Sequence, residues 1–258
     1  KELNCKLIQR TTRALNITAA GEELLPHAEQ IVNSMRHAFD ISKLAQDQEL
    51  SGNIKIALMP AWGLDVFSNI ISSFLDQNPK VTIEMHLSAS YADMISGGYD
   101  LIFRSSDRLE DSSFVAKKVA SVKSVFCATD NYLQANKSKD IKDHNFVLYQ
   151  MDQSKVKLSQ LKGENEQVAK ELSLPCAISA DFLHMIKKLV ILDHGIGLLP
   201  DFMIKDELKG ESKDGSLQIV DFLSNYFKLT NLYVLYPSRD FVPARVRALI
   251  EFIGGSLN

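Results

Sequence analysis

The side chains best suited to bind a ligand near the start of the chain form one short basic cluster, Arg10, Thr11, Thr12 and Arg13. Guanidinium groups and hydroxyls both donate hydrogen bonds to phosphate oxygens, so this cluster could contact a nucleic-acid backbone or its minor groove. Such contacts position a protein but carry little sequence information. A short basic run is also common on ordinary solvated surfaces, and the residues alone leave this alternative open.

Elsewhere the sequence lacks the spacing of a metal or catalytic site. The three cysteines, Cys5, Cys127 and Cys176, are far apart and form no CxxC pair, which is typical of thiols in a reducing cytoplasm. The six histidines form no HExxH or Cys/His cluster, and no GxSxG or phosphate-loop motif occurs. We therefore expect no metal, no cofactor and no catalytic residues.

The glycine pair Gly195 and Gly197 could suggest a dinucleotide site. The pair follows an expected helix and precedes an expected strand, however, whereas a phosphate-binding turn needs the reverse order. These glycines are better interpreted as part of a tight turn between a helix and a strand.

Composition indicates a protein with a sizeable hydrophobic core and no strong overall electrostatic field. The chain has 258 residues, of which 45% are hydrophobic and 24% charged, and its net charge is -3. No apolar run approaches the roughly 20 residues that span a bilayer, and no signal peptide is recognisable. We expect a cytoplasmic protein with no membrane partner, and any DNA contact confined to the basic beginning of the chain.

A long amphipathic helix is expected from Thr18 to about Gln46. Thr18 can cap its first turn, Ile17 can pack back onto that turn, and apolar residues recur at helical spacing. Pro26 should kink or split it. The helix could pack on its own domain, but we favour a partner helix from a second copy.

From residue 52 onward strands and helices alternate, which is typical of an α/β domain with a largely parallel sheet. In the first part we expect strands over 54–58, 81–87 and 99–103, and helices over 64–77 and 90–98. Two strands, 112–120 and 121–128, should follow, and the polar stretch 153–167 favours no definite element. Later we expect strands over 145–149, 174–180, 217–220 and 229–237, and helices over 130–134, 180–194, 201–208 and 243–255.

These patterns together resemble the LysR-type transcriptional regulators. The stretch LNCKLIQRTTRALNITAAG is similar to the wing and linker start of that family, with matches at Leu7, Arg10, Thr11, Arg13, Thr18, Ala20 and Gly21. Asn4 and Ile8 replace the usual Gly and Phe. The segments GNIKIAL, FLDQNPKVTIEM, YDLIFRSSDRLEDSSFVAKKV, HGIGLLPDFM and VLYPSRDFVPARVRALIEFI resemble its effector domain in order and spacing. Asp130 departs from the family pattern, which has Pro.

The resemblance implies an α/β fold with two Rossmann-like subdomains, similar to periplasmic binding proteins, preceded by a wing remnant and a long linker helix. It places the end of a winged helix-turn-helix at 1–17, a linker and dimerisation helix at 18–50, and an effector-binding domain at 51–258. Subdomain I would span about 52–126 and 227–258, and subdomain II about 127–226. The chain would be a fragment without most of the helix-turn-helix, and should bind DNA poorly.

The resemblance also implies a small effector between the subdomains, and ligands of open α/β sheets sit at the carboxyl ends of strands. Arg104 could hold a carboxylate ligand or brace the hinge through a salt bridge, and Trp62 could wall the ligand or fill the core. The residues expected at this site are Pro60, Ala61, Trp62, Ser88, Ala89, Ser90, Arg104, Ser105, Thr129, Ala180, Asp181 and Phe182.

The implied function is ligand-responsive control of transcription, in which the effector changes subdomain arrangement and oligomer geometry. The implied partners are DNA through the full-length protein, a small effector that could be an anion, and a homodimer or homotetramer. A periplasmic-type solute-binding receptor shares the cleft and is the main alternative. An enzyme on an α/β fold is a third, without a supporting motif.

Overall fold

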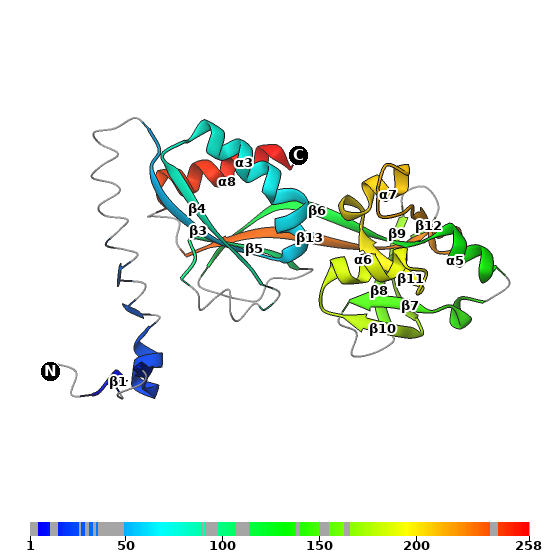
Figure 1. Ribbon diagram of the computed structural model, residues 1–258, viewed down its shortest axis with the longest axis horizontal. Coiled ribbons are helices and arrows are strands. Elements are labelled where there is room, and N and C mark those ends of the chain that lie inside the picture. Colours follow the sequence, from blue (N-terminus) through cyan, green and yellow to red (C-terminus); the bar gives the residue numbers. More distant parts are fainter. Residues whose placement is uncertain are drawn as a thin grey trace.

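Two long antiparallel strands, β6 (Val115–Ala128) and β13 (Tyr226–Tyr236), join the two halves of the molecule in the computed structural model (Figure 1). The structure describes residues 5–10, 15–25, 27–28, 31–32, 35, 49–88, 90, 98–106, 114–137, 140–149, 155–162, 166–237 and 242–257. Within this part of the chain one sheet has the strand order β10 (Cys176–Ala180), β7 (Phe146–Tyr149), β11 (Ile196–Pro200), β6, β13, β5 (Leu101–Ser106), β3 (Gly52–Leu58) and β4 (Val81–Leu87). We call the half with β3, β4 and β5 the first subdomain and the half with β7, β10 and β11 the second.

The first subdomain is a small α/β unit. Strand β3 (Gly52–Leu58) pairs in parallel with β4 (Val81–Leu87) and β5 (Leu101–Ser106). A continuous helical stretch follows β3: α2 (Pro60–Trp62), the π-helical turn η1 (Gly63–Phe67) and α3 (Ser68–Gln77). Helix α3 buries Ile70, Ile71 and Phe74, and it packs beside α8 (Ala244–Ser256) through a contact of Phe74 with Phe252 at 5.5 Å between ring centres.

The second subdomain repeats this plan. Strand β7 (Phe146–Tyr149) pairs in parallel with β10 (Cys176–Ala180) and β11 (Ile196–Pro200), and α6 (Leu183–Ile191) packs on them through buried Ile186 and Val190. The shorter elements are α5 (Asp130–Ala135), η2 (Ile141–Asp143), η3 (Asp201–Met203), α7 (Lys205–Lys209), β12 (Gln218–Ile219) and η4 (Asp221–Leu223). A hairpin of β8 (Lys155–Lys162) and β9 (Glu166–Ser173) joins β13 through β8.

The two subdomains have separate hydrophobic cores, and β6 and β13 pass from one core to the other. On β6, Val119 and Val122 belong to the first core, whereas Phe126 and Ala128 belong to the second. On β13, Tyr226 packs on the second core and Leu232 lies in the first. Residues 123–125 and 227–231 therefore lie at the crossing between the subdomains.

Two expectations about the strands need correction, and one stretch that the sequence left open forms strands. The sheet is mixed rather than largely parallel, because both crossing strands run antiparallel to their neighbours. The two strands expected over 112–120 and 121–128 are one strand, β6, since no glycine or proline interrupts that stretch. The polar stretch 153–167, which by itself favours no element, contributes β8 and the start of β9, and the described part of this hairpin spans 155–162 and 166–173.

The glycine turn before β11 is confirmed as a tight helix-to-strand connection. Gly195 has φ +151°, and a Cβ atom there would lie 2.5 Å from the backbone oxygen of Asn145. Because only glycine avoids that clash, this residue lets β11 pair closely with β7.

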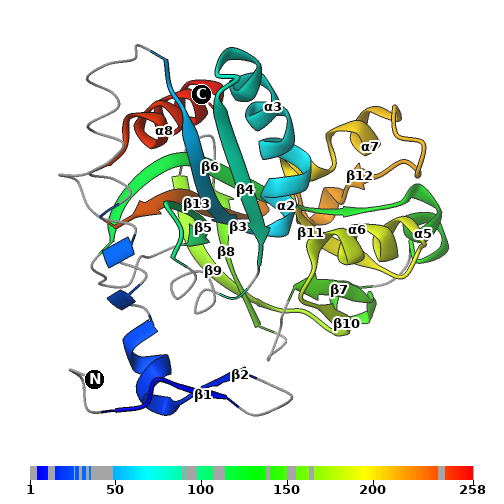
Figure 2. The same cartoon turned by 60° about the vertical axis from the view of Figure 1, so that its left-hand side comes forward.

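The beginning of the chain projects from the first subdomain as a separate segment in both views (Figures 1 and 2). Strands β1 (Ile8–Arg10) and β2 (Leu15–Ile17) form an antiparallel pair. Thr18 caps the helix that follows, since its Oγ1 accepts a hydrogen bond from the amide of Gly21 at 3.1 Å. The backbone is helical at 19–25, 27–28, 31–32 and 35, while the expected continuation over 36–46 lies outside the described residues. The helix expected over 90–98 lies almost wholly outside them as well.

Candidate functional site

Trp62 anchors the first wall of a pocket between the two subdomains. It lies where β3 runs through Met59 into a helix whose first residue, Pro60, is suited to that position. The indole is 4% exposed, and its Nε1 donates a hydrogen bond to Ser105 Oγ at 3.0 Å. Its ring also packs on Phe202 of the second subdomain, with ring centres 4.7 Å apart. Trp62 is therefore both a residue of the hydrophobic core and a part of the pocket wall.

The floor of the pocket is one face of the crossing strands. Lys228 of β13 lies opposite Ser124 of β6, and Thr230 lies opposite Val122. Since alternate residues of a strand share a face and directly opposed residues are neighbours, these four side chains point the same way. All four line the pocket.

The second subdomain supplies the opposite walls. The pocket has a volume of about 260 Å³, slightly below the range typical of sites for drug-sized ligands. Its other lining residues are Met59, Pro60, Ala61, Trp62, Ser105, Leu148, Tyr149, Val156, Asp181, Phe182, Leu183, Leu198, Pro200 and Phe202. Most of this lining is apolar, so a ligand with an apolar body would fit it.

Tyr149 and Asp181 are exposed residues of the lining, at the ends of adjacent strands β7 and β10. Burial raises the pKa of the Tyr149 hydroxyl above its ordinary value, and the nearby Asp181 carboxylate raises it further. Tyr149 therefore stays neutral at physiological pH, and Asp181 brings negative potential to the mouth of the pocket.

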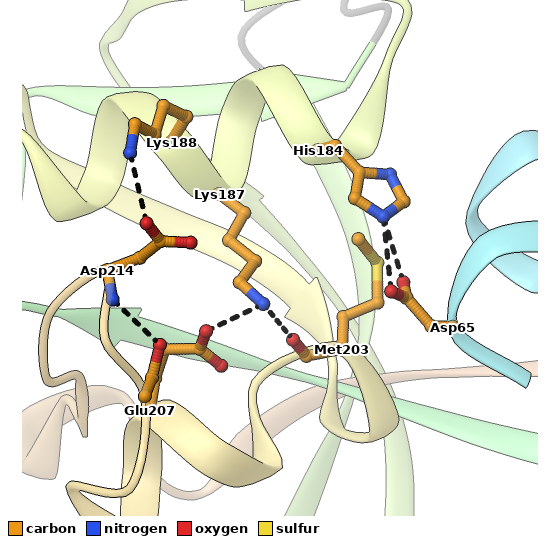
Figure 3. A network of polar contacts seen from close by, with 8 residues as sticks. Asp65, His184, Lys187, Lys188, Met203, Glu207 and Asp214 are labelled. Carbon is orange, nitrogen blue, oxygen red and sulfur yellow. Dashed lines mark hydrogen bonds and ion pairs between the residues drawn. The ribbon is translucent and has the colours of Figure 1, made fainter.

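A polar contact joins the two subdomains beside this pocket (Figure 3). Nε2 of His184, on α6, lies 3.0 and 3.2 Å from the two carboxylate oxygens of Asp65, on η1. The imidazole also packs on Phe182, a lining residue, with ring centres 5.2 Å apart. This contact links the two subdomains in the arrangement seen here, and we call it the latch.

A family model described as the LysR substrate binding domain matches residues 47–258. The chain belongs to the family of LysR-type transcriptional regulators. LtrA of Klebsiella pneumoniae, a probable HTH-type transcriptional regulator, is 27% identical over 258 residues, a match that covers 98% of this chain and 81% of LtrA. Both the resemblance and the non-enzymatic assignment are confirmed.

Solved structures of LysR-type regulators have the same architecture. The full-length virulence activator AphB of Vibrio cholerae is 26% identical, with a TM-score of 0.69, over 100% of this chain and 86% of AphB. CrgA of Neisseria meningitidis, at 20% identity and a TM-score of 0.67, shares the fold over 100% of this chain and 85% of its own. The expected fold class, with two subdomains like those of periplasmic binding proteins, is confirmed.

The pocket of this LysR-type chain brings together six of the residues expected from strand ends: Pro60, Ala61, Trp62, Ser105, Asp181 and Phe182. Four others, Ser88, Ser90, Thr129 and Ala180, are described but lie outside its lining, and Thr129 instead caps α5 by accepting a hydrogen bond from the amide of Tyr132. Ala89 lies outside the described residues.

Arg104, the cation considered for a carboxylate ligand, is not a lining residue. It precedes Ser105 on β5 and therefore points to the other face of the sheet, opposite Tyr233 of β13. Lys228 is the cation that does line the pocket, and the sequence reasoning missed it. Its signal was the alternation of apolar Phe227 and Leu229 with polar Lys228 and Thr230 in an otherwise apolar strand.

The wing residues are only partly described. Arg10 ends β1, whereas Thr11, Thr12 and Arg13 lie outside the described residues, between β1 and β2. An antiparallel pair around the basic cluster is compatible with a wing, and its contact with DNA stays a prediction.

Among the residues that the structure describes, no group of three or more His, Cys, Asp or Glu side chains could hold a metal ion. Over the same part of the chain, the helices are too short or too polar to cross a membrane.

Proposed function

We propose that this chain is the effector-sensing part of a LysR-type regulator. A small molecule binds between the subdomains, favours one subdomain arrangement, and so changes the geometry of the oligomer on DNA. The effector site would comprise the lining residues, and any role of Ser88, Ala89, Ser90, Arg104, Thr129 and Ala180 would follow from movement of the subdomains.

The observation that carries this proposal is the construction of the pocket. Its walls come from both subdomains, and its floor is the pair of strands that crosses between them. A ligand held there touches each moving part and the hinge, so its binding energy necessarily depends on the arrangement of the subdomains. The cleft alone would also suit a solute-binding receptor, but membership of the LysR family favours the regulator.

We propose the domain limits on the same basis: a wing at 1–17, a linker helix at 18–50, and an effector domain at 51–258. The crossing strands support subdomain limits near 126 and 227. In the linker helix, Leu25, Ile31, Val32 and Met35 are 42–68% exposed, an apolar surface that a second copy would cover. Assembly as a homodimer or homotetramer in the cytoplasm, and DNA binding through the full-length protein, follow from this role.

A pocket-filling substitution tests the proposal whatever the chemical identity of the effector. Thr230→Phe places a ring on the pocket floor, whereas Leu229→Phe places one on the opposite, exposed face of the same strand. In the full-length regulator with a reporter fused to its own promoter, we expect Thr230→Phe to bind DNA but lose the inducer response. Leu229→Phe should respond normally. A normal response from Thr230→Phe would place effector sensing elsewhere.

A further inference from the structure

The floor of the pocket holds a cation among hydroxyl groups. Lys228 faces Ser124 across the two strands, and Thr230 follows Lys228 on the same face. Ser124 is only 8% exposed and Lys228 is half-buried. An ammonium flanked by two hydroxyl donors is suited to bind a carboxylate, since all three groups donate hydrogen bonds to its oxygens.

The surroundings of Lys228 differ from those of Lys187, a half-buried lysine on α6. Lys187 has a built-in partner: its Nζ lies 2.8 Å from Glu207 Oε1 and 2.6 Å from the carbonyl oxygen of Met203 (Figure 3). Lys228 makes no ion pair with any residue of the described part of the chain, although it is the single cation among the lining residues. A cation in a largely apolar pocket that forms no ion pair with the described residues favours an anionic ligand.

The lining of the pocket disfavours a second negative charge on that ligand. Asp181 is exposed and lies among the lining residues on the second subdomain. A second carboxylate on the ligand would meet this aspartate or the apolar walls, and both are unfavourable. The volume of about 260 Å³ restricts the ligand to a small body.

We propose that the effector is a small organic monocarboxylate, with its carboxylate on Lys228, Ser124 and Thr230 and its apolar body against Trp62 and Phe202. This inference rests on the proposed function, because it assumes that the pocket is the effector site. It assigns to Lys228 the anion-binding role that the sequence reasoning considered for Arg104.

Trp62 provides a local readout, because it is the only tryptophan of the chain and it lines the pocket. The probes are matched pairs of acid and amide: hexanoate and hexanamide, phenylacetate and phenylacetamide, and 3-phenylpropanoate with its amide. Hexanedioate tests the limit of one charge. Each is titrated into wild-type protein, Lys228→Gln and Lys123→Gln while Trp62 fluorescence and thermal stability are recorded. Lys123 is the matched control, an exposed lysine on the opposite face of the same strand pair.

We expect at least one acid to change Trp62 emission saturably and to bind about tenfold more tightly than its amide and than hexanedioate. Lys228→Gln should abolish the preference for the acid, and Lys123→Gln should retain it. An amide that binds as well as its acid, an unchanged preference in Lys228→Gln, or no response to any acid would overturn the inference.

Failure of the wider proposal has a different signature. If amides shift Trp62 emission and acids do not, the pocket is a ligand site and only the charge assignment fails. If the probes raise thermal stability without any change in Trp62 emission, they bind elsewhere, and the pocket itself loses its assignment.

Discussion

At the scale of single residues, Trp62 links the first subdomain, the pocket and the second subdomain. Its indole is bonded to Ser105 within the first subdomain and packs on Phe202 of the second. A side chain with contacts on both sides of the cleft would respond both to the proposed ligand and to the arrangement of the two walls. The contribution of Trp62 to stability can therefore be measured in the absence of a ligand.

Removal of this side chain should be costly even without a ligand. We expect Trp62→Ala to lower the free energy of unfolding by about 3–5 kcal/mol, because a nearly buried aromatic side chain and its packing are lost. Phe182→Ala is the control, since that ring also lines the pocket but is 38% exposed, and it should cost about 1 kcal/mol or less. Urea unfolding followed by circular dichroism measures both, and equal costs would contradict this assignment of Trp62.

The thiol of Cys127 should be inert in the folded protein. Burial raises its pKa to about 12, so the folded state keeps it protonated while the unfolded chain ionises near the ordinary value of about 8.5. Because the folded state holds this proton more tightly, the protonated Cys127 thiol contributes fully to stability below about pH 8.5. The contribution is lost as the pH rises toward about 12.

Alkylation with iodoacetamide at pH 8, followed by peptide mass analysis, measures this protection. We expect exposed Cys5 to react rapidly and Cys127 to react only after unfolding in urea. Equal rates for the two thiols in the native protein would mean that the second core opens far more readily than its packing indicates.

At the scale of elements, the helix that begins at Thr18 has an apolar surface left uncovered in a single chain. Ile31 is 68% exposed and Met35 is 60% exposed. We expect Ile31→Glu to lower the assembly state by at least one step, because a charge would be buried in the helix pair. Size-exclusion chromatography with light scattering gives the molar mass. Glu22→Gln, on another face of the helix, should leave it unchanged, and an unchanged mass for Ile31→Glu would show that the helix does not mediate assembly.

Strand ends could be predicted from the sequence, and mid-strand positions could not. Trp62 and Asp181 follow short apolar strands and Ser105 lies at the end of β5, so the rule for open α/β sheets pointed to these lining residues. The same rule also pointed to Ser88 and Thr129, which do not line the pocket. Lys228 and Ser124 lie within the paired segments of the crossing strands, not at a carboxyl end. Their shared face depends on the pairing register of segments that are about 100 residues apart, which strand periodicity does not contain.

The hairpin β8–β9 illustrates the same limit. Its strands are largely polar because only one face is buried, through Val156 and Leu158, and composition alone suggested no definite structure there. Strand β8 pairs with β13, with Gln160 opposite Tyr226, and this tertiary pairing favours a strand that composition alone does not indicate.

At the scale of the whole molecule, the contact between His184 and Asp65 is a polar link between the two subdomains. The latch, which is the contact between His184 and Asp65 (Figure 3), lies beside the pocket. The side chain of each residue is about a quarter exposed. A contact of this exposure contributes modestly to stability, so the binding of a ligand could readily offset it. This fits the proposal that the effector changes the arrangement of the two halves about the crossing strands.

The distance between the subdomains, measured with and without a ligand, tests the central claim most directly. Asp76→Cys on α3 and Lys209→Cys on α7 place spin labels on the two subdomains, in a background with Cys5→Ser and Cys176→Ser. Double electron–electron resonance measures the distance between the two labels without ligand and with the acid that gives the largest change in Trp62 emission. We predict that the acid shifts or narrows the distance distribution, and that His184→Ala broadens it without ligand. An unchanged distribution at saturating acid would contradict the claim that this pocket controls the arrangement of the molecule.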